Sequence, residues 1–336
     1  MGCQRDIQVL DFPLSIKWYI TGKCNLRCTH CYLSDYTKEP DFDLVVRTLS
    51  YLKTKKVKNV SFLGGEPFYR SDFLEILDFA IKAGFVVKVA TNGLMLTPEF
   101  CQKLKQIGLK YIQVSLEGHS AEINDPVRGK GTFDKIIAGV ANAADAQIWT
   151  SAAFTLSSLN VKALPQLFER TSQAKAQQIR LAAFFPVGTG ASARDYMLSE
   201  DDLEYIHKTL PDLAKQYAHM YLESAFVEKK IPSCVNQGRT LGCGAGTSGL
   251  VINNDMSLSA CDILTEEDRT TERITHPEQI AKMWKTHPHF NKWRGLDNTP
   301  TPTIADFTEV HQEKCHVAYA TYGKNIWKPA QRKVTD

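Results

Sequence analysis

The sequence lacks the features that mark membrane, secreted and nucleic-acid-binding proteins. It has no apolar run near the roughly 18 residues of a membrane-spanning helix, and its first residues, MGCQRDIQVLDFPLS, contain no hydrophobic signal segment. Blocks of like charge and low-complexity tracts are missing, and the net charge is only +3. We therefore expect a cytoplasmic protein that binds neither membranes nor nucleic acids.

The sequence has nine cysteines but no secretion signal, so a disulfide framework is not expected. Metal binding or catalysis is favoured instead. Three of the cysteines, Cys24, Cys28 and Cys31, fall in the stretch KCNLRCTHCY. A zinc site needs a fourth ligand, and His30 lies too close to Cys28 and Cys31 to share one tetrahedron with both. Thiolates also hold iron–sulfur clusters, where three cysteines leave one iron open to a non-protein ligand.

Apolar, β-rich runs recur along the first part of the chain, at residues 14–21, 59–65, 85–91, 111–117, 148–155 and 178–187. Each run is continuous, which is typical of strands buried on both faces. Helical patterns lie between them. In residues 97–108, for example, we expect Thr97 as the cap, Pro98 as the first helical residue and Gly108 just past the end. Six strand–helix units predict a parallel sheet with right-handed crossovers. They are too few for a closed eightfold barrel, so we predict an α/β fold, a partial (β/α)6 barrel with ligands at the carboxyl ends of its strands.

The pattern changes after residue 198. Residues 198–226 are predicted to be helical, residues 248–264 to form a hairpin that turns at Asn253–Asp255, and residues 277–294 to be helical again. We expect three parts: the barrel at 1–198, a helical linker at 199–229, and a small α+β cap at 230–336. The cap contains further cysteines and is therefore expected to be supported by a metal.

The spacing C-x3-C-x2-C after the first strand of a six-unit partial barrel resembles the radical S-adenosylmethionine (radical SAM) enzymes. The resemblance implies that Cys24, Cys28 and Cys31 hold a [4Fe–4S] cluster whose open iron is chelated by SAM. A structural zinc knuckle and buried core thiols are the alternatives. The residue before the third cysteine is usually a large aromatic in this family. Here it is His30, whose imidazole is flat enough to lie against a base.

The resemblance extends to the ends of the following strands. The motif GGEP ends the second strand, where the family binds the SAM amino group, and Glu66 is the expected acceptor. Asn92, in ATNG, is expected at the ribose, and Ser115, in VSLEG, is a further contact. Arg128 is expected to pair with the SAM carboxylate, the alternative being an exposed structural salt bridge. Family members often carry Asp where this chain has Glu117. The expected SAM contacts are thus His30, Gly64, Gly65, Glu66, Pro67, Asn92, Ser115 and Arg128.

Cys243 and Cys261 bracket the predicted hairpin and resemble the start of a SPASM or twitch extension, which holds an auxiliary iron–sulfur cluster. Cys315 would be the third ligand. The later cysteines of the full SPASM pattern are missing and Met256 replaces a usual glycine, so at most one cluster, of twitch type, is expected. Core thiols or a zinc site are the alternatives. The fourth ligand stays open among Cys234, His316, Asp262 and the substrate. Cys3 and Cys101 are not expected to take part.

Cys234 has a second interpretation. A thiol near the substrate radical returns a hydrogen atom to the opposite face of a carbon, and such a catalytic cysteine would make the enzyme an epimerase. Cys234 is therefore a candidate both for the fourth cluster ligand and for the hydrogen donor.

The resemblance implies an enzyme that reductively cleaves SAM to a 5′-deoxyadenosyl radical, with electrons from a flavodoxin- or ferredoxin-type donor. The expected substrate is a ribosomally synthesised peptide, modified by cross-linking, thioether formation or epimerisation. Only 23 residues precede the first cluster cysteine, so we expect no leader-binding domain ahead of it. The second hypothesis is therefore a dehydrogenase or epimerase acting on a sugar, an aminocyclitol or a tetrapyrrole. A zinc-stapled binding protein is the third.

Overall fold

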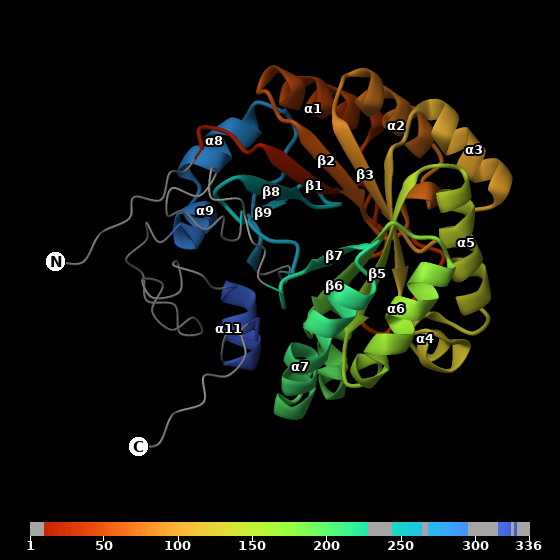
Figure 1. The fold of residues 1–336 in the computed structure, drawn as a ribbon. Coiled ribbons are helices and arrows are strands. Elements are labelled where there is room, and N and C mark those ends of the chain that lie inside the picture. The colour runs from red at the N-terminus through yellow and green to blue at the C-terminus, as the bar shows by residue number, and fades with distance from the viewer. Residues whose placement is uncertain (1–9, 228–243, 264–267, 295–314, 324–325, 328–336) are drawn as a thin grey trace, which may run out of the picture.

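Six parallel strands follow one another in chain order across the central sheet of the computed structural model, which describes residues 10–227, 244–263, 268–294, 315–323 and 326–327. The six predicted strands are confirmed, and helices join them on the outside of the sheet as a broad arc (Figure 1). The partial (β/α)6 barrel is therefore correct. The strands are β1 (Ser15–Tyr19), β2 (Asn59–Leu63), β3 (Val86–Thr91), β4 (Tyr111–Leu116), β5 (Trp149–Leu156) and β6 (Gln178–Ala183).

The helix boundaries follow from local sequence. Thr97 caps α3 by accepting a hydrogen bond from the Phe100 amide at 3.2 Å, Pro98 is its first residue, and Gly108 ends it at φ +99°, as predicted. The helices of the arc are α1 (Phe42–Thr54), α2 (Phe73–Lys82), α3 (Pro98–Ile107), α4 (Ala121–Arg128), α5 (Phe133–Asp145), α6 (Leu164–Gln173) and α7 (Glu200–Gln216); short 3₁₀ turns are η1 (Pro67–Tyr69), η2 (Val161–Ala163), η3 (Gly188–Ser192) and η4 (Arg194–Tyr196).

Three more strands extend the sheet at its two edges. β7 (Tyr221–Ser224) pairs in parallel with β6, so the helix expected over 198–226 ends earlier, at Gln216. The predicted hairpin is present as β8 (Gly249–Ile252) and β9 (Leu258–Ser259), which are antiparallel. β8 also pairs in parallel with β1, so the hairpin continues the barrel sheet in the order β7-β6-β5-β4-β3-β2-β1-β8-β9.

The turn of this hairpin contains Met256 in the left-handed region, at φ +65°. A glycine is usual at this place in the extensions that the segment resembles, and glycine is the residue that adopts positive φ without strain. The Met256 amide donates to the Asn253 carbonyl at 2.9 Å, and its side chain is buried. The hairpin thus keeps the backbone shape of a glycine turn and uses the side chain for packing.

The two faces of the strands differ. The face under the helices is apolar and fully buried, with Trp18, Phe62 and Val89 among its members. The opposite face, which lines the inside of the barrel, is only half-buried in β3 and β4, where buried and half-exposed residues alternate. The expectation of strands buried on both faces is therefore wrong for these strands, because their inner face carries polar side chains that keep contact with solvent.

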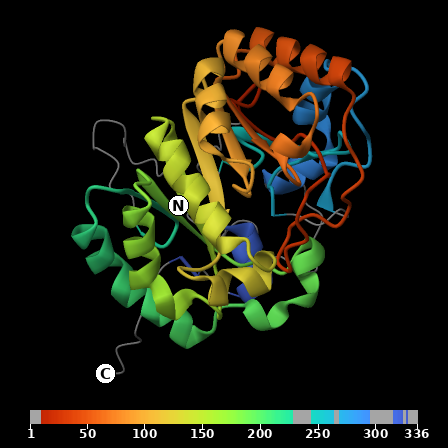
Figure 2. The same ribbon diagram turned by 90° about the vertical axis from the view of Figure 1, so that its right-hand side faces the viewer.

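Three of the described helices lie on the open side of the arc (Figures 1 and 2). Two of them, α8 (Gln279–Thr286) and α9 (Pro288–Trp293), lie next to β8 and β9, and the third, α11 (His316–Tyr322), lies nearer to α7 and the end of β6. The single helix predicted over 277–294 is divided in two, because the residue before a proline is biased away from helical conformation and His287 precedes Pro288. Tyr322 ties α11 to the end of β6 by donating to the Phe184 carbonyl at 2.6 Å. Among the described residues, no helix has the length and apolar character needed to cross a membrane.

His289 makes this C-terminal part sensitive to acid. Its Nε2 accepts a hydrogen bond from the Ala260 amide at 2.9 Å, which requires a neutral ring, and burial lowers the pKa of His289 from 6.5 to about 4. The folded state thus binds fewer protons than the unfolded state, and stability should fall as pH drops from about 6.5 towards about 4, by at most about 1.4 kcal/mol per pH unit. Thermal unfolding against pH, compared with His289→Gln, measures this; identical curves for both proteins would contradict it.

Candidate functional site

The cysteine triplet lies on the long loop between β1 and α1. Cys24, Cys28 and Cys31 are half-buried there, and the Cys31 amide donates to the Cys28 carbonyl at 3.2 Å. The Thr29 amide donates to the Val127 carbonyl at 3.0 Å, which ties the loop to α4. The loop therefore sits at the carboxyl end of the first strand, as predicted from the sequence.

The thiols of Cys24 and Cys31 lie close enough to Cys28 for their charges to act on its pKa. Burial raises the pKa of Cys24, and it raises the pKa of Cys28 to about 11 although the Arg128 guanidinium opposes this. Without a metal these two cysteines are therefore protonated at neutral pH, and metal binding must release their protons. Within the described part of the chain, no three Cys, His, Asp or Glu side chains meet closely enough to hold a single metal ion.

The GGEP turn after β2 packs directly against the start of the cysteine loop. The Gly65 amide donates to the Thr21 carbonyl at 2.8 Å, and the Glu66 amide donates to the Lys23 carbonyl at 2.8 Å. A Cβ on Gly65 would lie 2.3 Å from the Lys23 carbonyl oxygen. Only glycine permits this approach of two backbones. The turn and the loop thus form one surface at the carboxyl ends of β1 and β2.

Glu66 is fully buried and joins the ends of β2 and β3. Its carboxylate accepts hydrogen bonds from the Phe68 amide at 3.1 Å, the Thr91 hydroxyl at 2.8 Å and the Asn92 amide at 2.6 Å. Burial raises the pKa of Glu66 to about 7 against these three donors. A carboxylate has about four acceptor positions, so one remains for the SAM ammonium group. That contact stays a prediction.

Asn92 brings the end of β3 to the cysteine loop. Its Nδ2 donates to Asn25 Oδ1 at 2.7 Å and lies 4.0 Å from Cys24 Sγ. Ser115 is half-buried on β4 opposite Ala153. Asn92 therefore meets the cysteine loop as the sequence analysis requires, while the roles of Asn92 and Ser115 towards SAM stay predictions.

Glu117, after β4, holds two of the predicted residues at once. Its Oε1 lies 2.9 Å from His30 Nε2 and accepts from Arg128 Nη2 at 2.6 Å, and each of the three side chains is no more than 10% exposed. Burial opposes ionisation of Glu117, but His30 and Arg128 hold its pKa below the usual value. Arg128 also places Nη1 4.0 Å from Cys28 Sγ. The salt bridge of Arg128 is thus buried rather than exposed, and it joins α4 to the cysteine loop.

The backbone around Glu117 is held by two asparagines that the sequence analysis did not single out. Asn124 Oδ1 accepts from the Glu117 amide at 3.1 Å, and Asn160 Nδ2 donates to the Glu117 carbonyl at 2.9 Å. Both asparagines are buried. Their separation of 7 and 43 positions from Glu117 leaves no local sequence signal for these contacts.

The site fits the cofactors that the sequence implies. His30 Nδ1 and Arg128 Nε are buried and have no hydrogen-bond partner among the described residues, so both can serve a polar ligand. Three soft thiol donors suit iron–sulfur coordination. Beside them a narrow cavity of about 10 Å³, room for one water, is lined by His30, Glu117, Thr155, Ser157, Phe184 and Tyr196. Phe184 and Tyr196 follow β6.

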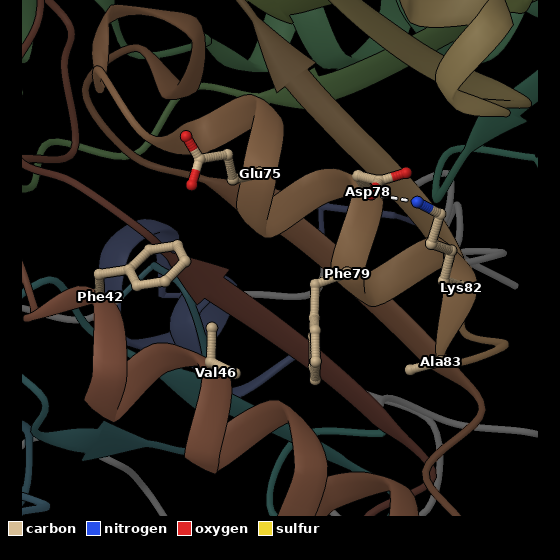
Figure 3. A pocket seen from close by; sticks show the side chains of 7 residues that line it. All are labelled: Phe42, Val46, Glu75, Asp78, Phe79, Lys82 and Ala83. Carbon is tan, nitrogen blue, oxygen red and sulfur yellow. Dashed lines mark hydrogen bonds and ion pairs between the residues drawn. The ribbon is translucent and has the colours of Figure 1, made fainter.

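A larger groove of about 580 Å³ lies elsewhere, on the outer surface between α1 and α2 (Figure 3). Phe42, Val46 and Phe79 form its apolar floor, and Glu75 and an Asp78–Lys82 ion pair border it. None of the predicted site residues lines this groove, so we assign it no part in the chemistry.

The residues expected to form an auxiliary site are described only in part. Cys261 follows β9 and is half-buried, and Cys315 is half-buried at the start of α11. Both pack against the same hydrophobic core. Asp262, considered as a fourth ligand, instead places both carboxylate oxygens 2.7 Å from Lys17 Nζ. Outside the described residues lie Cys3, Cys234, Cys243 and the side chain of His316.

Comparison with known proteins gives a consistent result. A family model described as the radical SAM superfamily matches residues 18–170. Mycofactocin maturase MftC of Mycobacterium tuberculosis is 33% identical over 294 residues, which cover 85% of this chain and 73% of that protein. MftC of Mycolicibacterium smegmatis is 35% identical over 195 residues, but the match covers only 48% of that protein.

Two further matches are to a synthase and to a solved structure. Fe-coproporphyrin III synthase of Methanosarcina barkeri is 32% identical over 193 residues, covering 55% of this chain and 47% of that protein. The crystal structure of Streptococcus suis SuiB bound to its precursor peptide SuiA superposes with a TM-score of 0.72 at 17% identity, covering 96% of this chain and 76% of SuiB. At this identity the structural likeness shows a shared fold.

Proposed function

Because this chain belongs to the radical SAM superfamily, we propose that it is a peptide maturase, which removes a hydrogen atom from a ribosomally synthesised peptide. The enzyme uses a [4Fe–4S] cluster and SAM. When bound, these cofactors supply the electron and the 5′-deoxyadenosyl radical that takes the hydrogen atom. The observation that carries the proposal is the convergence of the cysteine loop, the GGEP turn and Asn92 at the carboxyl ends of neighbouring strands.

In this proposal the side chains of the site bind and orient the cofactors. Cys24, Cys28 and Cys31 are the cluster ligands. Arg128 is held by Glu117 at 2.6 Å and keeps Nε available for the SAM carboxylate. Glu66 fixes the GGEP turn and accepts from the SAM ammonium group through its remaining lone pair.

The peptide substrate is supported by the MftC of M. tuberculosis, because that match extends over 85% of the chain. An auxiliary cluster held by Cys243, Cys261 and Cys315 belongs to the same proposal. Cys234 as hydrogen donor, and a flavodoxin- or ferredoxin-type electron donor, complete it.

Anaerobic reconstitution tests the proposed function. The protein with iron, sulfide, SAM and dithionite is expected to form 5′-deoxyadenosine. Peptides encoded by short reading frames beside the gene are the test substrates: cross-linking or thioether formation lowers the mass of the modified peptide by loss of hydrogen, and epimerisation in heavy water raises it through uptake of a deuterium atom. Liquid chromatography with mass spectrometry measures both products. Well-loaded protein that forms no 5′-deoxyadenosine would overturn the radical chemistry. Unchanged peptide with abundant 5′-deoxyadenosine would overturn only the substrate.

A tetrapyrrole is the second candidate substrate, because the match to Fe-coproporphyrin III synthase reaches a similar identity of 32%. The same assay with iron porphyrins and their tetrapyrrole precursors in place of the peptide decides between the two. Turnover of a tetrapyrrole and not of the peptide would favour this second function.

A further inference from the structure

Three cationic side chains project from the strands into the inside of the barrel. They are Lys17 on β1, Lys88 on β3 and Arg180 on β6. The neighbours of each along its strand are buried in the apolar core under the helices. Because side chains alternate along a strand, these three residues face the opposite way, towards the barrel interior. Lys17 and Lys88 both pair in register with Ser61 of β2, so they lie on one row across the sheet.

The three cations are not fully neutralised. Lys17 pairs with Asp262 through both carboxylate oxygens at 2.7 Å, and Arg180 pairs with Glu223 at 2.9 Å. Lys88 makes no ion pair with any described residue. Burial and the proximity of Arg180 and Lys17 lower the pKa of Lys88, and only Glu223 opposes them. The barrel interior therefore has one more cation than carboxylates among these five groups.

The interior is open enough to receive a ligand. The Lys17 side chain is 42% exposed and the Arg180 side chain 32% exposed. Solvent therefore reaches both side chains from the inside of the barrel.

The barrel interior reaches the cysteine loop. Tyr19, at the end of β1, donates to the Asp262 carbonyl at 3.2 Å, and Cys31 packs against the small hydrophobic cluster that contains Tyr19. A molecule held between Lys88 and Arg180 thus lies on the inner side of the loop that carries the three thiols.

We propose that Lys88, together with Arg180, binds a carboxylate of the substrate inside the barrel. Arg180 uses one of its five donors on Glu223 and has others for a carboxylate, and Lys88 supplies the uncompensated charge. The inference rests on the proposed function and narrows its substrate to one with a carboxylate. A peptide offers its C-terminal carboxylate, and a porphyrin offers propionates.

Two variants isolate the charge of Lys88. Lys88→Met removes the charge at nearly constant length, and Lys88→Arg keeps it. Lys82→Met is the matched control, because Lys82 lies on the outer surface of α2, is 74% exposed and pairs with Asp78. Iron content and thermal unfolding of each reconstituted protein establish that it is folded and loaded.

The measurement is the dissociation constant of four probes from the SAM-loaded enzyme by isothermal titration. The probes are the neighbour-encoded peptide as free acid and as C-terminal amide, and iron coproporphyrin III as free acid and as methyl ester. We expect wild type and Lys82→Met to bind one of the free acids at least tenfold more tightly than its neutral form. Lys88→Met should lose this preference and Lys88→Arg should largely restore it.

The pair that shows the preference identifies the source of the carboxylate. If Lys88→Met binds the free acids as tightly as wild type, or wild type prefers neither free acid, the inference is overturned. A lack of 5′-deoxyadenosine from wild type with SAM and dithionite would instead overturn the proposed function. The dissociation constants of the four probes would still test the inference.

Discussion

Replacing Cys28 with alanine is expected to remove the SAM-binding cluster and to lower 5′-deoxyadenosine formation at least about a hundredfold. Three thiolates are the minimum that holds a cubane with one open iron. Cys28 also sits 4.0 Å from the guanidinium of Arg128, so the cluster and the expected SAM carboxylate partner are adjacent. Iron and sulfide analysis gives the cluster content, and chromatography of the SAM cleavage products gives the activity.

Two further cysteine variants make this result specific. Cys101 is fully buried on α3 and has no predicted role, so Cys101→Ala should keep its iron and activity and lose about 1 kcal/mol of stability. Cys261→Ala should lose only the iron of the auxiliary cluster. A Cys28→Ala protein that retains full iron and forms 5′-deoxyadenosine at the wild-type rate is incompatible with the proposed ligand set.

Replacing Glu117 with alanine is expected to lower the free energy of unfolding by about 3–5 kcal/mol, because it leaves the Arg128 charge buried without its partner. His30 loses the same acceptor. This is a large part of the roughly 5–15 kcal/mol that stabilises a typical domain. Urea denaturation of the iron-free, reduced protein measures the loss without interference from cluster binding.

An exposed ion pair provides the comparison for this prediction. Asp145 pairs with Lys175 at 2.8 Å, but the two side chains are 58% and 65% exposed. Asp145→Ala should therefore change stability by less than about 1 kcal/mol. Glu117→Asp, the residue that the family often carries, should retain more stability than Glu117→Ala. Equal stability of Glu117→Ala and Asp145→Ala would show that the buried contacts of Glu117 with His30 and Arg128 contribute no more stability than a surface ion pair.

Much of the fold can be predicted from local sequence. The six barrel strands are long apolar runs. The ends of helices such as α3 are predicted by their terminal residues, here Thr97, Pro98 and Gly108. Pairing between distant segments has no such signal. Tyr221–Ser224 form β7 because they pair with the open edge of β6. In the sequence this short strand directly follows a helical pattern, so local sequence does not distinguish it. The addition of β8 to β1 is likewise a property of the assembled barrel.

The candidate site divides in the same way. The cysteine loop, the GGEP turn and Asn92 are recognisable from motifs at strand ends, and the structure brings them together. A single charged residue within an apolar strand belongs to no motif. The placement of Lys88, Lys17 and Arg180 inside the barrel therefore follows only from the alternation of side chains along the strands. The anchoring role of Glu117 also cannot be predicted from local sequence, because it depends on contacts with His30 and Arg128 from two other segments.

The pairing of β1 with β8 has a consequence for synthesis on the ribosome. Ser15 leaves the exit tunnel early, yet its partner Gly249 follows only after most of the barrel has been made. At about 5–20 residues per second this delay is on the order of 10–50 s. During that time the outer edge of β1 presents unpaired amides and carbonyls beside three reactive thiols. Nascent chains are thus most prone to pair with one another before the hairpin emerges, and chaperone supply during synthesis should raise the yield of intact protein.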